Sequence, residues 1–561
     1  NNITADFMEN HTISQNGNAQ GGALAVIYEN DTITSIGTAE NHAKFEGNYA
    51  QANTGNAYGG AIYNAGTIDN IYADFKDNKV SSASGSAYGH AIYNTGSIKN
   101  LTGSFINNKG SGSQTAVYNT GEMKISDILY DSNGKINNTG KMIVSGGVFK
   151  NNEASNGALY NDGGTISIKD IRVDSNNIFY GPIYNGNSDP TNSKIYIKNS
   201  DIINNNGFQG SSILNRGTIT AEDINVLGNT MTGGNGSLWS IGGTENIVAN
   251  TKDVIFKDNV TANGYEDYAA SGESTLNLNA ASGKSIDFSG RIRGDSTGNT
   301  LNINKSGLTY TDLKDDGTFD TETVNITQTG GDYIFRNQVS GQTMNLYDGA
   351  NVQLRQLYQA DGTTSYGNLS LTGFTSTGAG NILDTGNGRV DTSGQLVLGT
   401  TTLNANTNLR LDVNLANATA SAGDLLSGTW SSGSGNFVID SINILNTSTT
   451  TQALINNDTL KSHIAMASTY HTFEQDYKDR YTVTYSNGYL NFNQNKTGTF
   501  NLVGFLSNQD AASLTEYNMT SDEPVLRSIG AMTGTTKTVN AGNYTINGNG
   551  FTGVTVGENQ T

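Results

Sequence analysis

An aromatic or aliphatic residue followed three positions later by asparagine recurs ten times in the first half of this chain. Successive copies lie 19 to 38 residues apart, and an apolar-Tyr-Asn motif lies between most of them. Such a repeat indicates a unit that cannot bury its apolar face alone and must stack on its neighbours. The ten pairs are Phe7/Asn10, Phe45/Asn48, Phe75/Asn78, Phe105/Asn108, Tyr130/Asn133, Phe149/Asn152, Val173/Asn176, Ile203/Asn206, Val226/Asn229 and Phe256/Asn259.

The repeat predicts an all-β fold, a right-handed parallel β-helix in which each unit forms one coil. The unit from Gly59 to Asn78 contains three short alternating stretches separated by Gly and Asn. Alternation of inward and outward side chains marks strands, and tight corners with positive φ favour Gly and Asn. Because the units differ in length, we expect extra residues such as 79–89 to leave the stack as surface loops.

Period-two alternation assigns a direction to each side chain of the second motif. If Ile62 points inward, Tyr63 points outward and Asn64 lies at an inner corner. Equivalent amides in neighbouring coils can then hydrogen-bond along the stack, so we interpret the asparagines as a structural ladder. The predicted aliphatic column is Ile62, Ile92, Val117, Leu159 and Ile183, and the predicted asparagine column is Asn64, Asn94, Asn119, Asn161 and Asn185.

The motifs divide the chain into four predicted segments. Residues 1–265 hold regular coils, and 266–453 hold a less regular continuation with short alternating strands. A small non-solenoid β/α insertion is predicted for 454–533, with a hairpin turn at Asn487-Gly488 and short helices at 510–519 and 523–529. Residues 534–561 are expected to begin a further β-helix, which suggests a fragment of a longer protein.

Composition excludes several function classes. The chain carries 31 Lys and Arg against 50 Asp and Glu, a net charge of -19, which argues against binding nucleic acid or docking on anionic lipid. It contains no Cys, so disulfides and thiolate chemistry are excluded. No apolar run reaches the length of a membrane helix, and we expect no direct membrane insertion. We expect no cofactor and no metal.

One unit resembles a known family. Gly59-Gly60-Ala61-Ile62, flanked by Phe45-x-x-Asn48 and Phe75-x-x-Asn78, is similar to the paired G-G-A-I and F-x-x-N repeats of polymorphic membrane proteins, which are autotransporter passengers on bacterial surfaces. The resemblance covers about residues 1–260, and His90 replaces the second glycine in the next copy. Residues 422–428 and 438–445 also resemble the C-terminal passenger region of other autotransporter-like proteins. The resemblance implies secretion, display at the bacterial cell surface and often adhesion.

The main alternative is a polysaccharide lyase or hydrolase, because β-helices also carry such enzymes. These sites need two or three carboxylates clustered on one face. In the column two positions after each repeat aromatic, the acids Glu9, Asp77 and Asp258 are isolated from one another, so we predict no catalytic residues.

Metal chemistry has two weak candidates. An acidic group could bind Ca²⁺ or lie on a solvated loop; its members are Asp312, Asp315, Asp316 and Asp320. The histidines lack paired metal spacing, and His90 is expected to be exposed beside a corner. The five are His11, His42, His90, His463 and His471.

The remaining candidate site is a column of outward tyrosines. Aromatic rings with a polar edge suit flat contact with sugars or with a partner protein. The alternative is that the rings merely stack on one another and shield the strands. The column consists of Tyr63, Tyr93, Tyr118, Tyr160 and Tyr184. The expected function is thus a non-enzymatic adhesin or scaffold, binding a host or neighbouring-cell surface glycan or protein, with lateral self-association as a further expectation.

Overall fold

The computed structural model describes the chain in two compact units. Unit 1 comprises residues 1–383, 397–407 and 431–434, and unit 2 comprises 384–396, 408–430 and 435–561. Strands dominate both units, and no helix in the described part of the chain is long and apolar enough to cross a membrane. The described residues are 2–110, 114–208, 212–233, 235–295, 297–314, 318–388, 395–414, 424–446, 452–456, 458–472, 481–494, 525–526, 542–546 and 554–556.

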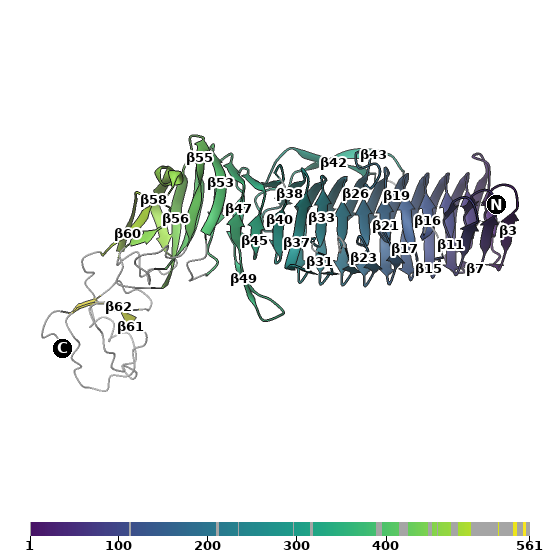
Figure 1. Cartoon of the computed structure of the whole chain (residues 1–561), viewed down its shortest axis with the longest axis horizontal. Coiled ribbons are helices and arrows are strands. Elements are labelled where there is room, and N and C mark those ends of the chain that lie inside the picture. Colours follow the sequence, from purple (N-terminus) through teal and green to yellow (C-terminus); the bar gives the residue numbers. More distant parts are fainter. Residues whose placement is uncertain are drawn as a thin grey trace, which may run out of the picture. The chain divides into compact units, whose positions relative to one another are not determined.

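Unit 1 is a parallel β-helix, as predicted (Figure 1). The first face of each coil carries the Tyr-Asn motif: β5 (Leu24–Val26), β10 (Ile62–Asn64), β14 (Ile92–Asn94), β16 (Thr115–Asn119), β18 (Lys135–Asn138), β21 (Leu159–Asn161), β25 (Ile183–Asn185), β29 (Ile213–Asn215), β33 (Leu238–Ile241), β37 (Gly264–Ser271), β40 (Arg291–Gly294), β45 (Gln338–Ser340) and β50 (Asn368–Ser370). The second face follows: β6 (Thr32–Ile36), β22 (Thr165–Lys169), β26 (Lys194–Lys198), β30 (Thr218–Glu222), β34 (Thr244–Ala249), β38 (Thr275–Ala280), β41 (Thr300–Ile303), β46 (Thr343–Leu346) and β51 (Gly373–Ser376).

The third face carries the aromatic of the first motif. Its separate strands are β2 (Phe7–Met8), β7 (Ala43–Glu46), β23 (Arg172–Asp174), β27 (Asp201–Ile203), β31 (Asn225–Leu227), β35 (Val254–Lys257), β39 (Ser285–Phe288), β44 (Asp332–Phe335), β47 (Asn351–Leu354) and β52 (Asn381–Asp384). Four long strands run through both second and third faces: β11 (Thr67–Lys76), β15 (Ser97–Ile106), β17 (Glu122–Asp131) and β19 (Lys141–Lys150). β1 (Asn2–Ile3) pairs with β6, and β53 (Gln395–Leu403) pairs with β51.

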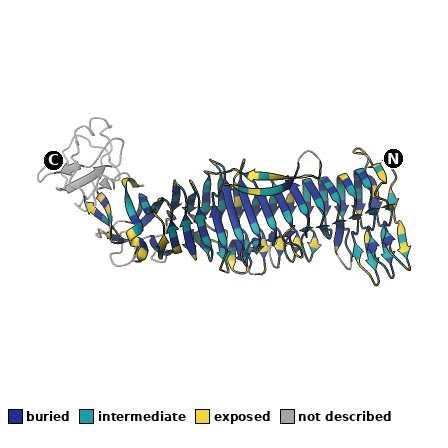
Figure 2. Ribbon diagram, turned by 90° about the horizontal axis from the view of Figure 1, so that it is seen from above, coloured by how far each residue is buried: buried dark blue, intermediate teal, exposed yellow. Residues whose placement is uncertain are grey.

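Equivalent residues of successive coils lie directly beside one another. Ile62 pairs with Ile92, which pairs with Val117, and all three are fully buried. The aliphatic column predicted from sequence is therefore confirmed, with Ile136 of β18 inserted between Val117 and Leu159. Figure 2 shows the resulting alternation of buried and less buried positions along the strands of unit 1. This register stacks the interior side chains into continuous columns.

The first asparagine ladder runs through the Tyr-Asn strands. Asn64 Nδ2 donates to Asn94 Oδ1 at 2.7 Å, and Asn94 donates in the same way to Asn119 at 2.7 Å. The predicted ladder is confirmed, and it also includes Asn138 and Asn215. Each of these amides is fully buried, so the ladder satisfies polar groups that water cannot reach, except for Asn64 Oδ1 at its start, which accepts no bond from a described residue.

A second ladder joins the asparagines of the aromatic motif. Asn78, for example, donates from both its backbone N and its Nδ2 to Asn108 Oδ1, at 3.1 and 2.9 Å. The predicted pair Ile203/Asn206 is wrong by one residue, because Ile202 and Asn205 occupy the column. Three consecutive asparagines, 204–206, made the sequence register ambiguous.

A pair of small sheets, here called the wing, extends from the first three coils. One sheet consists of β3 (His11–Ser14), β8 (Tyr49–Ala52) and β12 (Lys79–Ser82), and the other of β4 (Ala19–Gln20), β9 (Ala57–Tyr58) and β13 (Ala87–Tyr88). The sheets share a thin core of small side chains, Ala19, Ala50, Ala52, Ala57 and Val80. The surface loop expected over 79–89 is therefore wrong: its ends form strands, because equivalent segments in the two preceding coils pair with them.

Two antiparallel hairpins interrupt the later coils. The first, here called the strap, consists of β42 (Leu308–Leu313) and β43 (Thr321–Ile326), and its ring Tyr310 stacks on Tyr196 of β26 at 4.9 Å. The second consists of β48 (Gln356–Tyr358) and β49 (Thr364–Tyr366). The β-helix continues past residue 265, because the strands of successive coils still pair in parallel around these hairpins. The strap thus lies against coils that precede it by more than 100 residues in sequence.

The described strands of unit 2 include the predicted hairpin. β59 (Tyr481–Ser486) and β60 (Tyr489–Gln494) pair antiparallel, and the turn residues Asn487 and Gly488 both have positive φ. The helix expected over 523–529 is wrong where the structure describes it, because Val525–Leu526 form β61, which pairs with β62 (Gly542–Ile546). The helix expected at 510–519 lies outside the described residues. The further solenoid expected from 534 stays a prediction.

The remaining described elements lie wholly or largely in unit 2. They are β54 (Thr407–Asn414), β55 (Leu425–Ser432), β56 (Phe437–Asn446), β57 (Gln452–Leu454), the 3-10 helix η1 (Thr459–His463), β58 (Ile464–Thr472) and β63 (Val554–Val556).

Candidate functional site: an aromatic groove on the β-helix

The predicted tyrosine column is only partly exposed. Tyr63, Tyr93 and Tyr118 pair in register, and their rings stack at centroid distances of 5.7 and 5.3 Å. Two wing tyrosines join them: Tyr58 lies 4.6 Å from the Tyr93 ring, and Tyr88 lies 4.9 Å from the Tyr118 ring. All five are half-buried. Burial and the neighbouring phenols raise the pKa of the Tyr93 hydroxyl, which stays a neutral donor.

The column does not continue as an exposed surface. Asn137 occupies the next coil, and beyond it Tyr160 and Tyr184 are only 5% and 3% exposed. Lys135 Nζ lies 4.4 Å over the Tyr160 ring, and Tyr180 packs against Tyr184. The prediction of five exposed tyrosines is therefore wrong for these two, because side chains from outside the motif cover them. The first three tyrosines, Tyr63, Tyr93 and Tyr118, stack on one another, as the alternative expectation stated.

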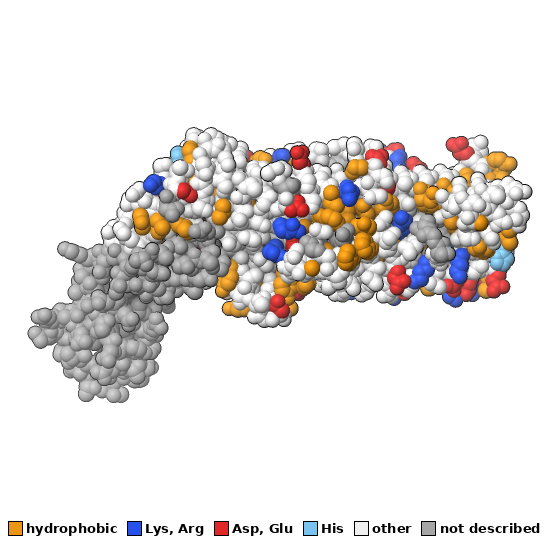
Figure 3. Space-filling view, in the orientation of Figure 1, with side chains coloured by type: hydrophobic (Ala, Val, Ile, Leu, Met, Phe, Trp, Pro, Cys, Tyr) orange, Lys and Arg blue, Asp and Glu red, His pale blue; other side chains and the backbone are white. Residues whose placement is uncertain are grey.

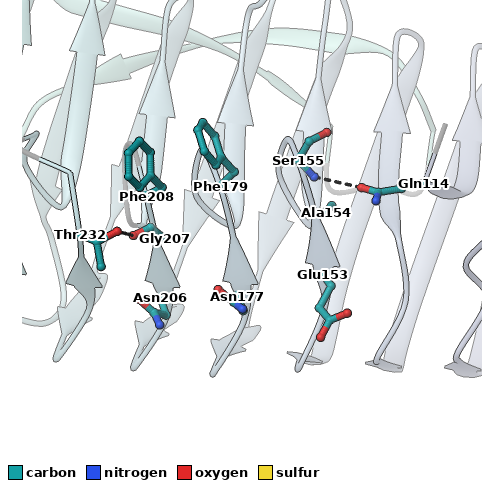
Figure 4. Close-up of a pocket in the computed structure, with 10 residues that line it drawn as sticks. All are labelled: Gln114, Glu153, Ala154, Ser155, Asn177, Phe179, Asn206, Gly207, Phe208 and Thr232. Atoms are coloured by element: carbon teal, nitrogen blue, oxygen red, sulfur yellow. Dashed lines mark hydrogen bonds between the residues drawn. The ribbon is translucent and has the colours of Figure 1, made fainter. Parts of the chain in front are cut away.

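A groove lies on another surface of unit 1, where short strands follow the second asparagine ladder. These strands are β20 (Glu153–Ala154), β24 (Asn177–Ile178), β28 (Asn206–Gly207), β32 (Thr230–Met231) and β36 (Val260–Thr261). The groove has a volume of about 550 Å³ and spans successive coils from Gln114 to Thr232 (Figure 4). Its volume is in the range of sites for small ligands.

Two rows of outward side chains line the groove. Glu153, Asn177 and Asn206 pair in register and form a polar row. Directly after the three strands come Ser155, Phe179 and Phe208, and Figure 4 shows the two phenyl rings side by side. Because neighbouring coils lie about 4.8 Å apart, the groove presents similar groups at regular steps. The other lining residues are Gln114, Ala154, Gly207 and Thr232.

The two phenylalanines are unusual because they are large, apolar and exposed. Phe179 is 43% and Phe208 47% exposed, and their rings stack at 4.9 Å. Figure 4 shows Ser155 at the level of the Phe179 ring on one side of the pair, and Thr232 beside Gly207 on the other side, below the Phe208 ring. Contiguous exposed apolar patches with a polar rim mark interaction sites or ligand-binding grooves.

Polar contacts hold the groove walls in place. The Lys109 ammonium lies 3.2 Å from Glu153 Oε2, so the carboxylate is charge-paired. Ser155 N donates to Gln114 Oε1 at 3.1 Å, and Thr232 N donates to the Gly207 carbonyl at 3.0 Å. The exposed side-chain amides of Asn177 and Asn206 face outward between these walls. The groove therefore combines an apolar platform with amide and hydroxyl groups and nearly balanced charge.

The phenylalanine pair continues into a larger apolar patch. Phe179 contacts Tyr180 edge-on at 4.8 Å, and Tyr180 packs on a cluster with Trp239 and Ile241. The buried members of that cluster are Tyr160, Tyr184 and Leu214. Figure 3 shows hydrophobic side chains gathered where Figure 1 labels β21 and β33. Tyr160 and Tyr184, the buried members of the predicted tyrosine column, thus lie in the patch that borders the groove.

Sequence reasoning missed the groove, although a signal was present. Asn176-Asn177-Ile178-Phe179 and Asn205-Asn206-Gly207-Phe208 repeat an N-N-x-F pattern on consecutive coils. The first asparagine of each belongs to the ladder, and alternation then sends the second asparagine and the phenylalanine outward.

Carboxylates gather beneath the strap in a cavity of about 260 Å³. Glu222 accepts from Tyr196 at 2.9 Å and pairs with Lys198 at 3.0 Å. Asp312 is buried 3.9 Å from Lys169, and burial raises the pKa of its carboxyl group. Of these contacts, the Lys169–Asp312 ion pair joins the strap to the β-helix, whereas the Glu222 contacts join β26 and β30 beneath it.

The two weak metal candidates also take other roles. The expectation of a solvated loop is wrong for Asp312, which is a buried residue of strap strand β42. Asp320 pairs with Lys314 at 3.4 Å, and Asp315 and Asp316 lie outside the described residues. His90 is buried rather than exposed, with 1% of its surface accessible. Within the described ranges, no group of three or more His, Asp or Glu side chains could hold a metal ion.

Comparison with known proteins adds no assignment. No family model matches the chain, and neither a curated protein nor a solved structure matches it significantly.

Proposed function

We propose that this chain is an adhesive β-helical passenger, displayed at a bacterial cell surface, and that the groove of unit 1 binds a neutral glycan. The observation that carries the proposal is the exposed stacked pair Phe179 and Phe208 beside a groove of about 550 Å³. Surface display rests on the resemblance of the repeats to autotransporter passengers.

The chemistry of the lining favours a carbohydrate. Sugar rings present C–H groups to aromatic faces and hydroxyl groups to amides, and the groove offers both types of partner. Glu153 is paired with Lys109, so the walls provide no unpaired cation for an acidic sugar. The net charge of -19 on the whole chain also disfavours a polyanion.

The repetition of the coils favours an extended ligand over a single sugar. Asn177 and Asn206 are register partners one coil apart, as are the positions of Phe179 and Phe208. An oligosaccharide lying along the stack would therefore meet an amide and an aromatic ring at each step. We expect affinity to increase with chain length until the ligand spans the coils from Ser155 to Thr232.

A glycan array on the purified chain tests the proposal, followed by calorimetry with the best ligand. We expect Phe179→Ser and Phe208→Ser each to weaken binding about tenfold, or roughly 1.4 kcal/mol. Tyr358→Ser is the matched control, because Tyr358 is 74% exposed on the second hairpin, outside the groove. Equal binding by all three variants would reject the groove as the site.

A reducing-sugar assay on the same ligands distinguishes the adhesin from the enzymatic alternative. Release of reducing ends, abolished by Glu153→Gln, would replace the adhesin with a hydrolase. Inertness in both array and assay would instead favour a plain structural scaffold, the role that the two continuous ladders support.

A further inference from the structure

Two neighbouring coils of the groove carry the same pair of outward side chains. Asn177 is followed two residues later by Phe179, and Asn206 is followed in the same way by Phe208. The two asparagines are register partners in β24 and β28, and the two phenyl rings lie 4.9 Å apart. The groove therefore contains one pair of amides beside one pair of aromatic rings.

The amide pair differs from the interior ladder next to it. One residue earlier in each coil, Asn176 Nδ2 donates to Asn205 Oδ1 at 2.9 Å, and both of these side chains are fully buried. Asn177 and Asn206 are exposed instead, and neither side-chain amide forms a hydrogen bond within the part of the chain that the structure describes. Their donors and acceptors are thus available to a ligand from solvent.

An amide group of a ligand fits between these two side chains. Each asparagine offers two N–H donors and a carbonyl acceptor. A secondary amide offers one N–H and one C=O, so it can accept a bond from one asparagine and donate a bond to the other. The interior amides of this chain bond in the same way from coil to coil. The ligand amide would continue that pattern on the outside of the stack.

The phenyl pair selects what that amide carries. Two residues of extended chain span roughly 7 Å, so the rings lie beside the amides in the same groove (Figure 4). A methyl group on the ligand amide would contact Phe179 and Phe208, which are 43% and 47% exposed, and would remove apolar surface from water. A hydroxyl group can bridge two asparagines, but it brings no apolar group to the rings. The lining therefore favours an acetamido group.

The charges at the end of the polar row favour a neutral ligand. Glu153 is the register partner of Asn177, and its carboxylate is paired with the Lys109 ammonium at 3.2 Å. The carboxylate of an acidic sugar would approach Glu153 at a cost in repulsion. The ammonium of an unacetylated amino sugar would meet a carboxylate that already has a partner. An acetamido sugar carries neither charge.

We propose that the groove selects glycans containing an N-acetylhexosamine, whose acetamido group bridges Asn177 and Asn206 and whose methyl group packs on the two phenyl rings. The inference rests on the proposed glycan binding and adds the chemical group that is recognised. In the next coil the same row holds Thr230, and no phenylalanine follows it two residues later. The site therefore recognises one acetamido group, and neighbouring sugars contact the groove on either side of it.

Matched glycans that differ at this group alone test the inference. Each N-acetylhexosamine glycan on the array is compared with its counterpart that has a hydroxyl in place of the acetamido group. The β-1,4-linked trimer of N-acetylglucosamine and cellotriose form one such pair. Calorimetry on the pair with the strongest signal should give about tenfold tighter binding for the acetylated member, since it gains a hydrogen bond and a methyl contact.

Alanine variants along the polar row assign the preference to the two asparagines. Asn177→Ala and Asn206→Ala should each bring the affinity ratio of the pair close to one, because each removes a bond to the acetamido group. Thr230→Ala is the matched control, since Thr230 is an exposed register partner of Asn206 without a neighbouring phenylalanine, and it should leave the ratio unchanged. Because all three positions are exposed, the melting temperatures should change little.

Equal affinity for both members of every pair, with binding still weakened by Phe179→Ser, would overturn the acetamido proposal and leave glycan binding in the groove intact. A tenfold preference that persists in both asparagine variants would also overturn it. A blocked N-acetylated peptide that displaces the glycan at equal concentration would assign the site to proteins instead. The absence of binding to any glycan would reject the proposed function, and this inference with it.

Discussion

The side-chain amide of Asn215 donates from Nδ2 to Oε1 of Glu245 at 2.5 Å, which ends the first asparagine ladder on a buried carboxyl group. The second ladder ends in the same way, since Asn259 Nδ2 donates to Asp267 Oδ1 at 2.8 Å. Each side-chain amide in a ladder donates to the amide of the next coil. The last amide has no further asparagine to donate to, so it needs a different acceptor. Both ladders stop where the regular motifs end, near residue 265.

The two terminal acids predict a pH-dependent stability. Burial raises the pKa of Glu245 and of Asp267 to about 7, despite the hydrogen bonds that favour ionisation. A folded pKa above the unfolded value gives stability that is present at low pH and is lost as pH rises through the folded pKa. The free energy of unfolding of unit 1 should therefore decrease between about pH 4 and pH 8, by on the order of 3 kcal/mol for each acid.

Chemical denaturation of wild type, Glu245→Gln and Asp267→Asn at intervals across that range checks this. Each variant should flatten part of the profile, because it removes one titrating group. Buried His90, with its pKa lowered to about 4, acts in the opposite direction and is present in all three proteins. An unchanged pH slope in both variants would mean that these acids do not titrate with folding.

Breaking a ladder in the middle should cost more than breaking it at its end. Asn119 is fully buried and bonds Asn94, Asn138 and two carbonyls. Asn119→Ala should destabilise unit 1 by about 2–4 kcal/mol, because several buried partners lose their bonds. Asn10→Ala, at the exposed start of the second ladder, should cost less than about 1 kcal/mol. Similar losses for the two variants, measured by urea unfolding, would argue against cooperative ladders.

Substitution by alanine should affect stability very differently at the two equivalent positions Gly60 and His90. Gly60→Ala places a Cβ 2.4 Å from the Lys79 carbonyl oxygen, so we expect a loss of several kcal/mol or a failure to fold. His90→Ala removes a side chain instead of adding one to a crowded position, so it should retain the fold, with melting temperature as the measurement. A Gly60→Ala protein as stable as His90→Ala would show that the wing coils do not pack as described.

The interior of unit 1 could be predicted from sequence because each coil repeats the same alternation. Ile62 and Asn64 follow directly from the period-two pattern and the recurrence of the motif. What failed depended on residues outside the motif. Tyr160 is covered by Lys135, and His90 is buried where its ring accepts a hydrogen bond from Val80 N, and no single repeat encodes these contacts.

Long-range contacts were equally inaccessible. The strap returns to β26, where Tyr310 meets Tyr196, and nothing in its local pattern indicates that partner. The groove was missed for a different reason. Its N-N-x-F pattern appears only twice, and the three asparagines at 204–206 concealed the register of the second copy.

Tryptophan fluorescence tests the central claim, glycan binding in the groove, most directly. Trp239 packs in the apolar patch that borders the groove, and Trp430 belongs to unit 2, so Trp430→Phe leaves Trp239 as the reporter. Titration with the best ligand from the array should shift Trp239 emission with the dissociation constant found by calorimetry, and Phe179→Ser with Phe208→Ser should abolish the shift. Undiminished calorimetric binding by that double phenylalanine variant, with a silent Trp239, would contradict the account.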